Sequence, residues 1–113
     1  MAKDKLYLIT PGFTDPNKPG TQFVCPFCNQ IEGLLKSFPE LADKVEIERV
    51  GFLRPRRAVI DAIGEANQSL PVIVFGENPP VDARDHLGVS FINDTTRILE
   101  LLSERHGFPR LHA

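Results

Sequence analysis

The stretch "TQFVCPFCNQIEGLLKSF", residues 21–38, decides the fold because it places two cysteines at the start of a helix. Pro26 suits the first turn of a helix, and Pro39 closes the segment. Apolar residues between the two prolines recur at helical spacing, at positions 27, 31, 34, 35 and 38. We therefore predict a helix that begins at Cys25 and Cys28.

Strand-like and helix-like segments alternate along the rest of the chain. Helical spacing predicts a second helix from Pro55 to Ala66, and Asp94 can cap a third one. Four short segments are typical of strands: "KLYLIT" (5–10), "VEIERV" (45–50), "LPVIVF" (70–75) and "SFIN" (90–93). The order βαβαββα predicts one α/β domain over residues 1–113, a four-stranded mixed sheet with helices on both faces.

Composition narrows the class of protein. The 113 residues are 42% hydrophobic and 25% charged, as in globular domains, and they leave no room for a second domain. A net charge of −2 predicts no general attraction to nucleic acid or to a membrane. No apolar run is long enough for a secretory signal or a membrane span, so we expect a cytoplasmic protein. Cysteines in that reducing compartment rarely form permanent disulfides.

The residues alone leave three interpretations of the cysteine pair open. As helix N-cap, Cys25 would lie beside free backbone N–H groups that favour its thiolate, and Cys28 would follow about one turn later. Such a pair can carry out reversible disulfide exchange. Alternatively, the pair could contribute to a zinc site, although the chain has no second C-x-x-C and its three histidines are scattered. Both thiols could also be inert packing residues.

Two polar segments, 11–24 and 76–89, are expected to be long loops. The first leads into Cys25 and the second into the strand before Asp94, so both should flank the site. Candidate wall residues are Phe13, Phe23, Arg84 and His86, and His86 could favour a nearby thiolate. Whether the 11–24 segment admits a substrate to Cys25 or shuts it away stays open at this point.

Three separated motifs resemble the thioredoxin-like superfamily. "CPFC" is similar to the Cys-Pro-Tyr-Cys centre of glutaredoxins, and "SLPVIVF" resembles the segment around that superfamily's cis-proline, here Pro71. "NDTTRILELLSERHG" resembles the last strand and helix of glutathione transferase N-terminal domains. The pattern "PGF-DP-PG" ahead of "CPFC" is also similar to a bacterial domain-of-unknown-function family.

The resemblance implies a thioredoxin-like fold and a glutaredoxin-like thiol-disulfide oxidoreductase. Cys25 would attack the substrate and Cys28 would resolve the mixed disulfide. The implied ligand contacts are the backbone of Leu70 beside Pro71, and Asp94 and Thr95 at the γ-glutamyl end of glutathione.

Partners follow from the same resemblance. We expect glutathione, as co-substrate, or a thiol or disulfide protein, and neither a resident cofactor nor a metal. Arg54 and Arg57 are further candidate contacts because arginine pairs with carboxylates. Two alternatives stand beside this interpretation: a non-catalytic thioredoxin-like binding module, and a thiol-based redox or metal sensor. The sequence does not indicate an oligomeric state.

Overall fold

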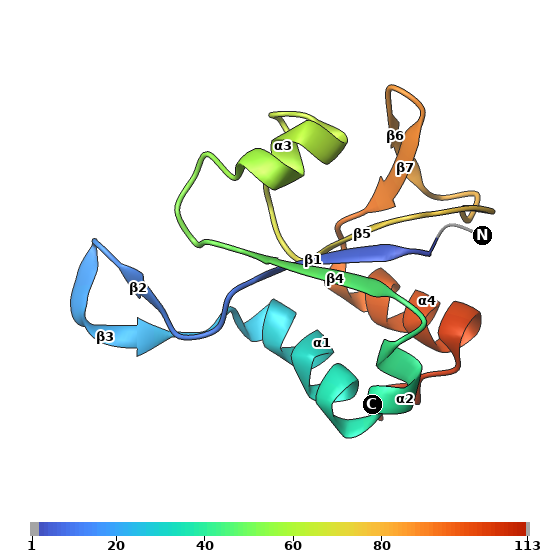
Figure 1. Ribbon diagram of the computed structural model, residues 1–113, viewed down its shortest axis with the longest axis horizontal. Coiled ribbons are helices and arrows are strands. Elements are labelled where there is room, and N and C mark those ends of the chain that lie inside the picture. Colours follow the sequence, from blue (N-terminus) through green and yellow to red (C-terminus); the bar gives the residue numbers. More distant parts are fainter. Residues whose placement is uncertain (1–2, 113) are drawn as a thin grey trace.

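The computed structural model describes residues 3–112 and shows a mixed α/β architecture (Figure 1). The main sheet has five strands in the order β4-β1-β5-β7-β6: β1 (Lys5–Ile9), β4 (Glu46–Val50), β5 (Val72–Val74), β6 (Arg84–His86) and β7 (Val89–Ile92). A separate hairpin holds β2 (Phe13–Asp15) and β3 (Lys18–Phe23). The helices are α1 (Pro26–Ser37), α2 (Pro39–Ala42), α3 (Arg57–Ile63) and α4 (Thr95–His106).

Strand β1 lies inside the sheet, where it pairs parallel with β4 and antiparallel with β5. Leu6 is opposite Ile47 on one side and Ile73 on the other. Strand β7 pairs antiparallel with both β5 and β6. The sheet is therefore mixed, with β4 and β6 at its edges.

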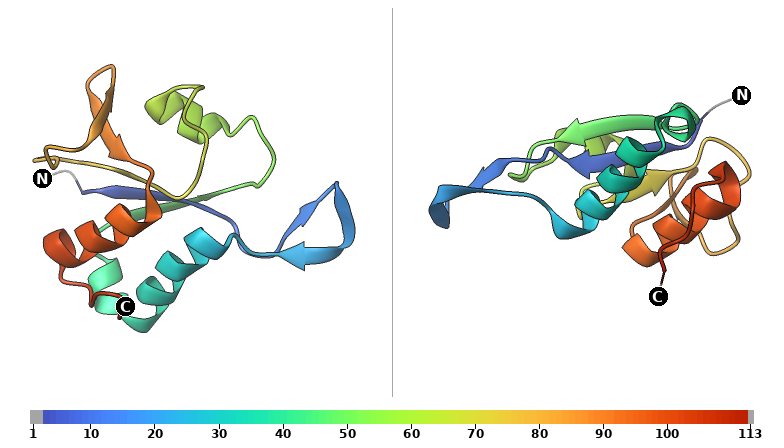
Figure 2. Two further views of the ribbon diagram at one scale, coloured as in Figure 1. Left: turned by 180° about the vertical axis from the view of Figure 1, so that it is seen from behind. Right: turned by 90° about the horizontal axis from the view of Figure 1, so that it is seen from below.

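Alternate residues of β1 enter two separate cores, one on each face of the sheet. Leu6 and Leu8 pack in the cluster that also contains Ile31 of α1 and Ile98 of α4. Tyr7 instead packs in the cluster that contains Val59 and Ile63 of α3, with Val72 and Phe91 from the sheet. Figures 1 and 2 show α3 on the opposite side of the sheet from α1 and α4. Helices therefore cover both faces, as the sequence predicts.

The prediction of a structureless loop over residues 11–24 is wrong. Strands β2 and β3 form an antiparallel hairpin, which projects from the body as an arm (Figures 1 and 2). The turn between them is tied by the Asn17 N–H, which donates to the Asp15 carboxylate at 2.9 Å. Gly12 precedes the hairpin at φ +79°, a backbone conformation that favours glycine. Because most arm residues are polar and exposed, they carry no alternating hydrophobic signal.

The prediction of four strands in the sheet is also wrong, since β6 adds a fifth at the edge. It lies within the segment 76–89 that was expected to be a loop, and it pairs with β7 from Arg84–Phe91 to His86–Val89. Leu87 and Gly88 form the two-residue turn, both with positive φ (50° and 86°), as tight hairpins require. Leucine is an unusual residue in such a position, so the sequence carries no clear turn signal.

Helix boundaries differ from the prediction at three places. Helix α3 begins at Arg57 rather than Pro55, and it ends at Ile63 because Gly64 turns the chain at φ +92°. Pro39 ends α1 as expected but also begins the short helix α2. Asp94 caps α4 as predicted, since its carboxylate accepts the Arg97 N–H at 2.9 Å. No helix in residues 3–112 is long and apolar enough to cross a membrane.

Candidate functional site

Cys25 is the N-cap residue of α1. Its backbone is extended (φ −71°, ψ 119°), Pro26 follows in the first turn, and its Sγ accepts the backbone N–H of Cys28 at 3.2 Å. An N–H donor and the positive end of a helix dipole both stabilise negative charge on a sulfur. Neither cysteine forms a disulfide. The local geometry therefore gives Cys25 Sγ both a hydrogen-bond donor and the positive end of a helix dipole.

Cys28 has a very different environment. It is 1% exposed, and the Ile9 N–H points at its Sγ from 3.5 Å. Burial, the largest cause, raises the pKa of the Cys28 thiol to about 12; the neighbouring Cys25 adds to the rise, and the Ile9 N–H opposes it. Cys28 is therefore a protonated thiol at neutral pH. The two thiols therefore differ in environment: Cys25 lines a pocket at a helix N-terminus, and Cys28 is buried behind it.

A pocket of about 300 Å³ lies over Cys25, although the residue itself is only 9% exposed. The arm builds one wall, because Phe13 stacks on Phe52 with ring centroids 4.3 Å apart and lies 6.1 Å from the Phe23 ring. The full lining is Ile9, Phe13, Asp15, Lys18, Phe23, Val24, Cys25, Pro26, Phe27 and Phe52. We call this the Cys25 pocket, and its walls are mainly apolar.

A second pocket, of about 410 Å³, lies on the other side of Phe27 and is more polar. Its lining residues are Phe27, Gln30, Leu70, Asn93, Asp94, Thr95 and Thr96, and we call it the Asp94 pocket. The peptide bond between Leu70 and the buried Pro71 is cis. Three expected ligand contacts, Leu70, Asp94 and Thr95, are thus brought together, and Phe27 links their pocket to that of Cys25.

Comparison with known proteins assigns the chain to a family. A family model described as "Protein of unknown function (DUF3088)" matches residues 3–110, which is nearly the whole chain. The chain belongs to this family. The expected resemblance to a domain-of-unknown-function family is thereby confirmed at the level of the family. Neither a curated protein nor a solved structure matches the chain.

The arginines of this DUF3088 domain are arranged differently from the sequence prediction. Arg54 and Arg57 are exposed and line neither of the two pockets. Arg56, between them, is 8% exposed, and its guanidinium donates to the Phe52 carbonyl at 2.6 and 3.1 Å and to the Gln68 carbonyl at 2.8 Å. It thus ties the loop that carries Phe52 to the loop that leads to the cis-proline.

Arg56 also lies within electrostatic reach of the cysteines. Burial, followed by the neighbouring Arg54 charge, lowers the pKa of Arg56, while negative charge on Cys28 and Cys25 acts in the opposite direction. The sequence shows only a basic run here; burial of its middle member depends on tertiary packing.

The two expected wall residues from the 76–89 segment lie away from Cys25. The His86 ring packs against Gly64, where an added Cβ would come within 2.7 Å of it, so His86 closes the end of α3. The expectation that it could act on the thiolate is therefore not supported by its position. Arg84 lies over the Phe91 ring and lines a different cavity, next to Asp94. By contrast, Phe13 and Phe23 do line the Cys25 pocket, as expected.

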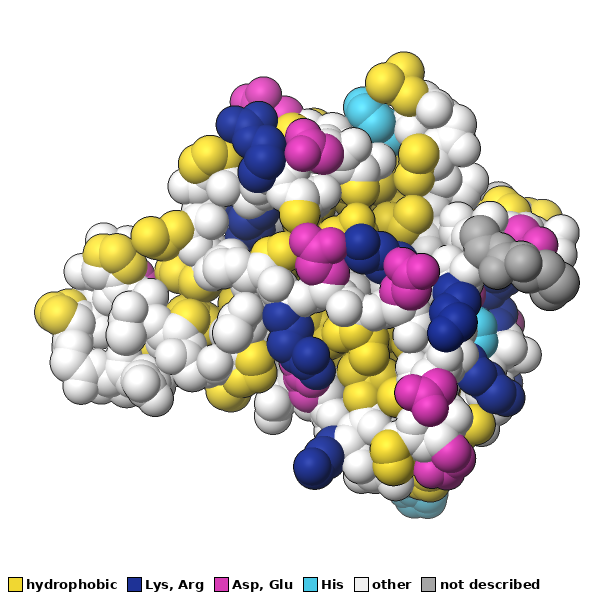
Figure 3. All heavy atoms as spheres, viewed as in Figure 1, with side chains coloured by type: hydrophobic (Ala, Val, Ile, Leu, Met, Phe, Trp, Pro, Cys, Tyr) yellow, Lys and Arg dark blue, Asp and Glu magenta, His cyan; other side chains and the backbone are white. Residues whose placement is uncertain are grey.

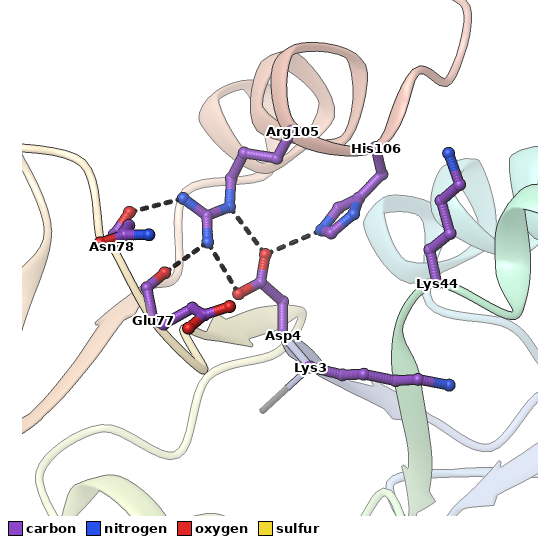
Figure 4. Close-up of a pocket in the computed structure, with 7 residues that line it drawn as sticks. All are labelled: Lys3, Asp4, Lys44, Glu77, Asn78, Arg105 and His106. Atoms are coloured by element: carbon purple, nitrogen blue, oxygen red, sulfur yellow. Dashed lines mark hydrogen bonds and ion pairs between the residues drawn. The ribbon is translucent and has the colours of Figure 1, made fainter. Parts of the chain in front are cut away.

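A buried ion cluster lies at the opposite end of β1 from the cysteines (Figure 4). Asp4, just before β1, accepts hydrogen bonds from Arg105 at 2.7 and 3.0 Å, from the Gly76 N–H at 3.0 Å, and meets His106 at 2.8 Å. Burial alone would raise the pKa of Asp4, but these hydrogen bonds outweigh it and hold the pKa below its usual value. The cluster joins the start of β1 to the end of α4.

Across residues 3–112, no group of three or more His, Cys, Asp or Glu side chains is placed to hold a metal ion. The chemistry available at Cys25 and Cys28 is that of two neighbouring thiols, one at a helix N-terminus below an apolar pocket and one buried behind it.

Proposed function

We propose that the chain is a glutaredoxin-like thiol-disulfide oxidoreductase with a thioredoxin-like fold. The asymmetry of the two cysteines carries the proposal. Cys25 Sγ accepts a backbone N–H at a helix N-terminus and lines a pocket, whereas Cys28 is buried with a pKa of about 12. Attack by one thiol and delayed resolution by the other need this difference.

The surrounding architecture supports the same proposal. Strands β4-β1-β5-β7, with β1 and β4 parallel and the other neighbours antiparallel, correspond to the four strands that the resemblance implies, and β6 is an addition. The cis bond at Leu70–Pro71 and the capping Asp94 match the features that the resemblance assigns to binding of an extended thiol peptide or glutathione, and Leu70 and Asp94 line one pocket.

The proposed reaction proceeds in two thiol-disulfide exchanges. The Cys25 thiolate attacks one sulfur of a substrate disulfide, which forms a mixed disulfide on Cys25 and releases the other substrate sulfur as a thiolate that takes up a proton. Cys28 then loses its proton and attacks Cys25 Sγ, so that the second substrate thiol leaves. The substrate gains two electrons and the protein is left with a Cys25–Cys28 disulfide. A low-molecular-weight thiol such as glutathione restores the dithiol by the reverse exchanges.

Exchange with glutathione disulfide tests the proposal. The reduced protein is mixed with the disulfide, quenched in acid and analysed by intact mass. We expect the wild type to end as the intramolecular disulfide, Cys28→Ser to accumulate a stable glutathione adduct, and Cys25→Ser to form none. Cys28→Ser is the matched control, since it removes one thiol of the same pair. A folded wild-type protein that forms neither product, with glutathione disulfide or with a small uncharged disulfide, would contradict the proposal.

The low exposure of Cys25 favours one alternative, a non-catalytic binding module. At 9% exposure the thiol would be a packing residue, and the Asp94 pocket would be the binding groove. That module would bind its partner equally well in the Cys25→Ser variant and would lose binding when Asp94 is replaced by alanine. The exchange experiment separates the two, because a packing thiol forms no adduct.

A further inference from the structure

The substrate class can be narrowed from the pocket that covers Cys25. This step rests on the proposed function, because it concerns what reaches the Cys25 sulfur. Four phenyl rings, those of Phe13, Phe23, Phe27 and Phe52, line the pocket, together with aliphatic Ile9 and Val24. Its volume of about 300 Å³ lies at the lower limit for ligand pockets, so it suits one apolar group rather than a large ligand.

The apolar lining continues onto the surface on both sides of the sulfur. Val24 and Phe27, the residues that flank Cys25 and Pro26, are 48% and 57% exposed. Large apolar side chains held in the open beside a reactive group are typical of a contact surface. Figure 3 shows hydrophobic side chains gathered where the arm joins the body.

The charged side chains around the two pockets disfavour a substrate with two carboxylates, such as glutathione. The Cys25 pocket has one cation, Lys18, and one carboxylate, Asp15, at its rim, and the neighbouring Asp94 pocket adds a second carboxylate. The two arginines that were expected to bind carboxylates, Arg54 and Arg57, line neither pocket. The combined site thus offers one positive charge against two negative charges.

The arm holds its part of this wall in a fixed position. The Gly12 N–H donates to the Phe23 carbonyl at 2.9 Å and closes the base of the hairpin. The Phe13 ring lies nearly parallel to Phe52, at 5°, and Phe52 is in turn fixed through its carbonyl by Arg56. A rigid aromatic wall can discriminate between substrates, since it keeps its shape whether or not the pocket is filled.

We propose that the preferred substrate is a peptide or protein disulfide whose reacting cysteine has an apolar residue beside it, and that this residue enters the Cys25 pocket between Phe13, Phe23 and Phe52. The β2–β3 arm is then a specificity element. The substrate sulfur meets Cys25 at the pocket floor, and the two exchanges follow as described above.

Two matched peptide disulfides test this inference. Each peptide has a single cysteine in mixed disulfide with 2-mercaptoethanol, preceded by phenylalanine in one peptide and by serine in the other. Rates of reduction by the dithiol protein are measured under second-order conditions. Burial of one apolar side chain predicts that the phenylalanine peptide reacts roughly 10- to 100-fold faster than the serine peptide. A third substrate, the mixed disulfide of 2-phenylethanethiol with 2-mercaptoethanol, has an apolar group and no peptide, and its alkyl thiol does not leave faster than cysteine. It shows whether the protein recognises the apolar group alone or also the peptide backbone.

Variants of the arm connect the preference to the pocket. Phe23→Ser should reduce the ratio of the two rates toward one, and Phe23→Leu, which keeps an apolar side chain, should retain most of it. Leu87→Ser, an exposed position in the distant β6–β7 turn, is the matched control and should leave the ratio as in the wild type.

The possible outcomes separate this inference from the proposed function. Exchange with both peptides at equal rates, or a Phe23→Ser ratio equal to that of the wild type, overturns the apolar pocket and leaves the oxidoreductase in place. A faster reaction of the 2-phenylethanethiol disulfide than of the phenylalanine peptide overturns the peptide as substrate. No exchange with any disulfide, in a folded protein, overturns the proposed function itself.

Discussion

Replacement of Cys25 by serine leaves Cys28 as the single thiol of the chain, so the reactivity of the buried thiol can be measured by itself. With a pKa of about 12, Cys28 is a thiolate in about one molecule in 10⁴ at pH 8. A free cysteine with a pKa near 8.5 is about one quarter thiolate at that pH. The Cys25→Ser variant loses the smaller contribution of Cys25 to the raised pKa and keeps burial, which is the largest one. Since only the thiolate is alkylated, we expect Cys28 in this variant to react at least about 10²-fold more slowly than a free cysteine.

Alkylation by iodoacetamide, followed by intact mass between pH 7 and 11, measures this rate. The rate should rise tenfold per pH unit from pH 7 to pH 10, because burial keeps the pKa of the Cys28 thiol above that range. Denaturant should restore the rate of a free cysteine, since burial is the largest cause of the raised pKa. Cys28→Ser, which keeps the N-cap Cys25, is run in parallel. A folded Cys25→Ser protein that reacts within tenfold of free cysteine at pH 8, or whose rate levels off below pH 10, would refute the argument.

Two further predictions concern stability. Asp4→Asn should lower the free energy of unfolding by about 3 kcal/mol at pH 7. This value is at the low end of the cost of breaking a buried ion pair, because the Arg105 side chain is partly exposed. Folding lowers the Asp4 pKa, so the stability difference between wild type and variant should be complete above pH 5 and shrink as pH falls below about 4. Urea titrations at several pH values measure this difference. Asp61→Asn, at an exposed position, is the control and should change the free energy of unfolding by less than about 0.5 kcal/mol. Arg56→Gln leaves the Phe52 and Gln68 carbonyls without their guanidinium donor, which should lower the free energy of unfolding by about 1–3 kcal/mol for each. A total decrease below about 1 kcal/mol would contradict the role of Arg56 in joining the two loops.

Strong local signals explain which parts of the fold the sequence predicts. The core strands are apolar runs, and the first helix combines Pro26 in its first turn with an apolar face, so sequence and tertiary packing agree on them. The sequence also predicts Asp94 as a helix cap, and an N-cap carboxylate that bonds a backbone N–H three residues on needs only local geometry.

The missed elements lack such signals. The arm is built mostly from polar, exposed residues, so its strands show no alternation. In the β6–β7 turn, the first of the two positive-φ positions is occupied by Leu87 (φ 50°) rather than by glycine or asparagine. The position of Arg56 depends on carbonyls that lie four and twelve residues away, which a basic run in the sequence does not reveal. The same limit applies to His86, whose place is set by the absence of a side chain at Gly64.

The position of the arm bears on whether the 11–24 segment admits a substrate or shuts it away. The hairpin projects outward, with Phe13 and Phe23 at its base packed near Cys25 and with Asp15 and Lys18 also lining the pocket. A lid would need arm residues packed over the sulfur, whereas here the arm forms a side wall of the pocket. Cys25 is 9% exposed because the helix start and the aromatic walls surround it, so approach is restricted to groups that can enter between phenyl rings. Under the proposed function, the same phenyl rings set both access to this thiol and its selectivity, so a change to the base of the arm should alter both together.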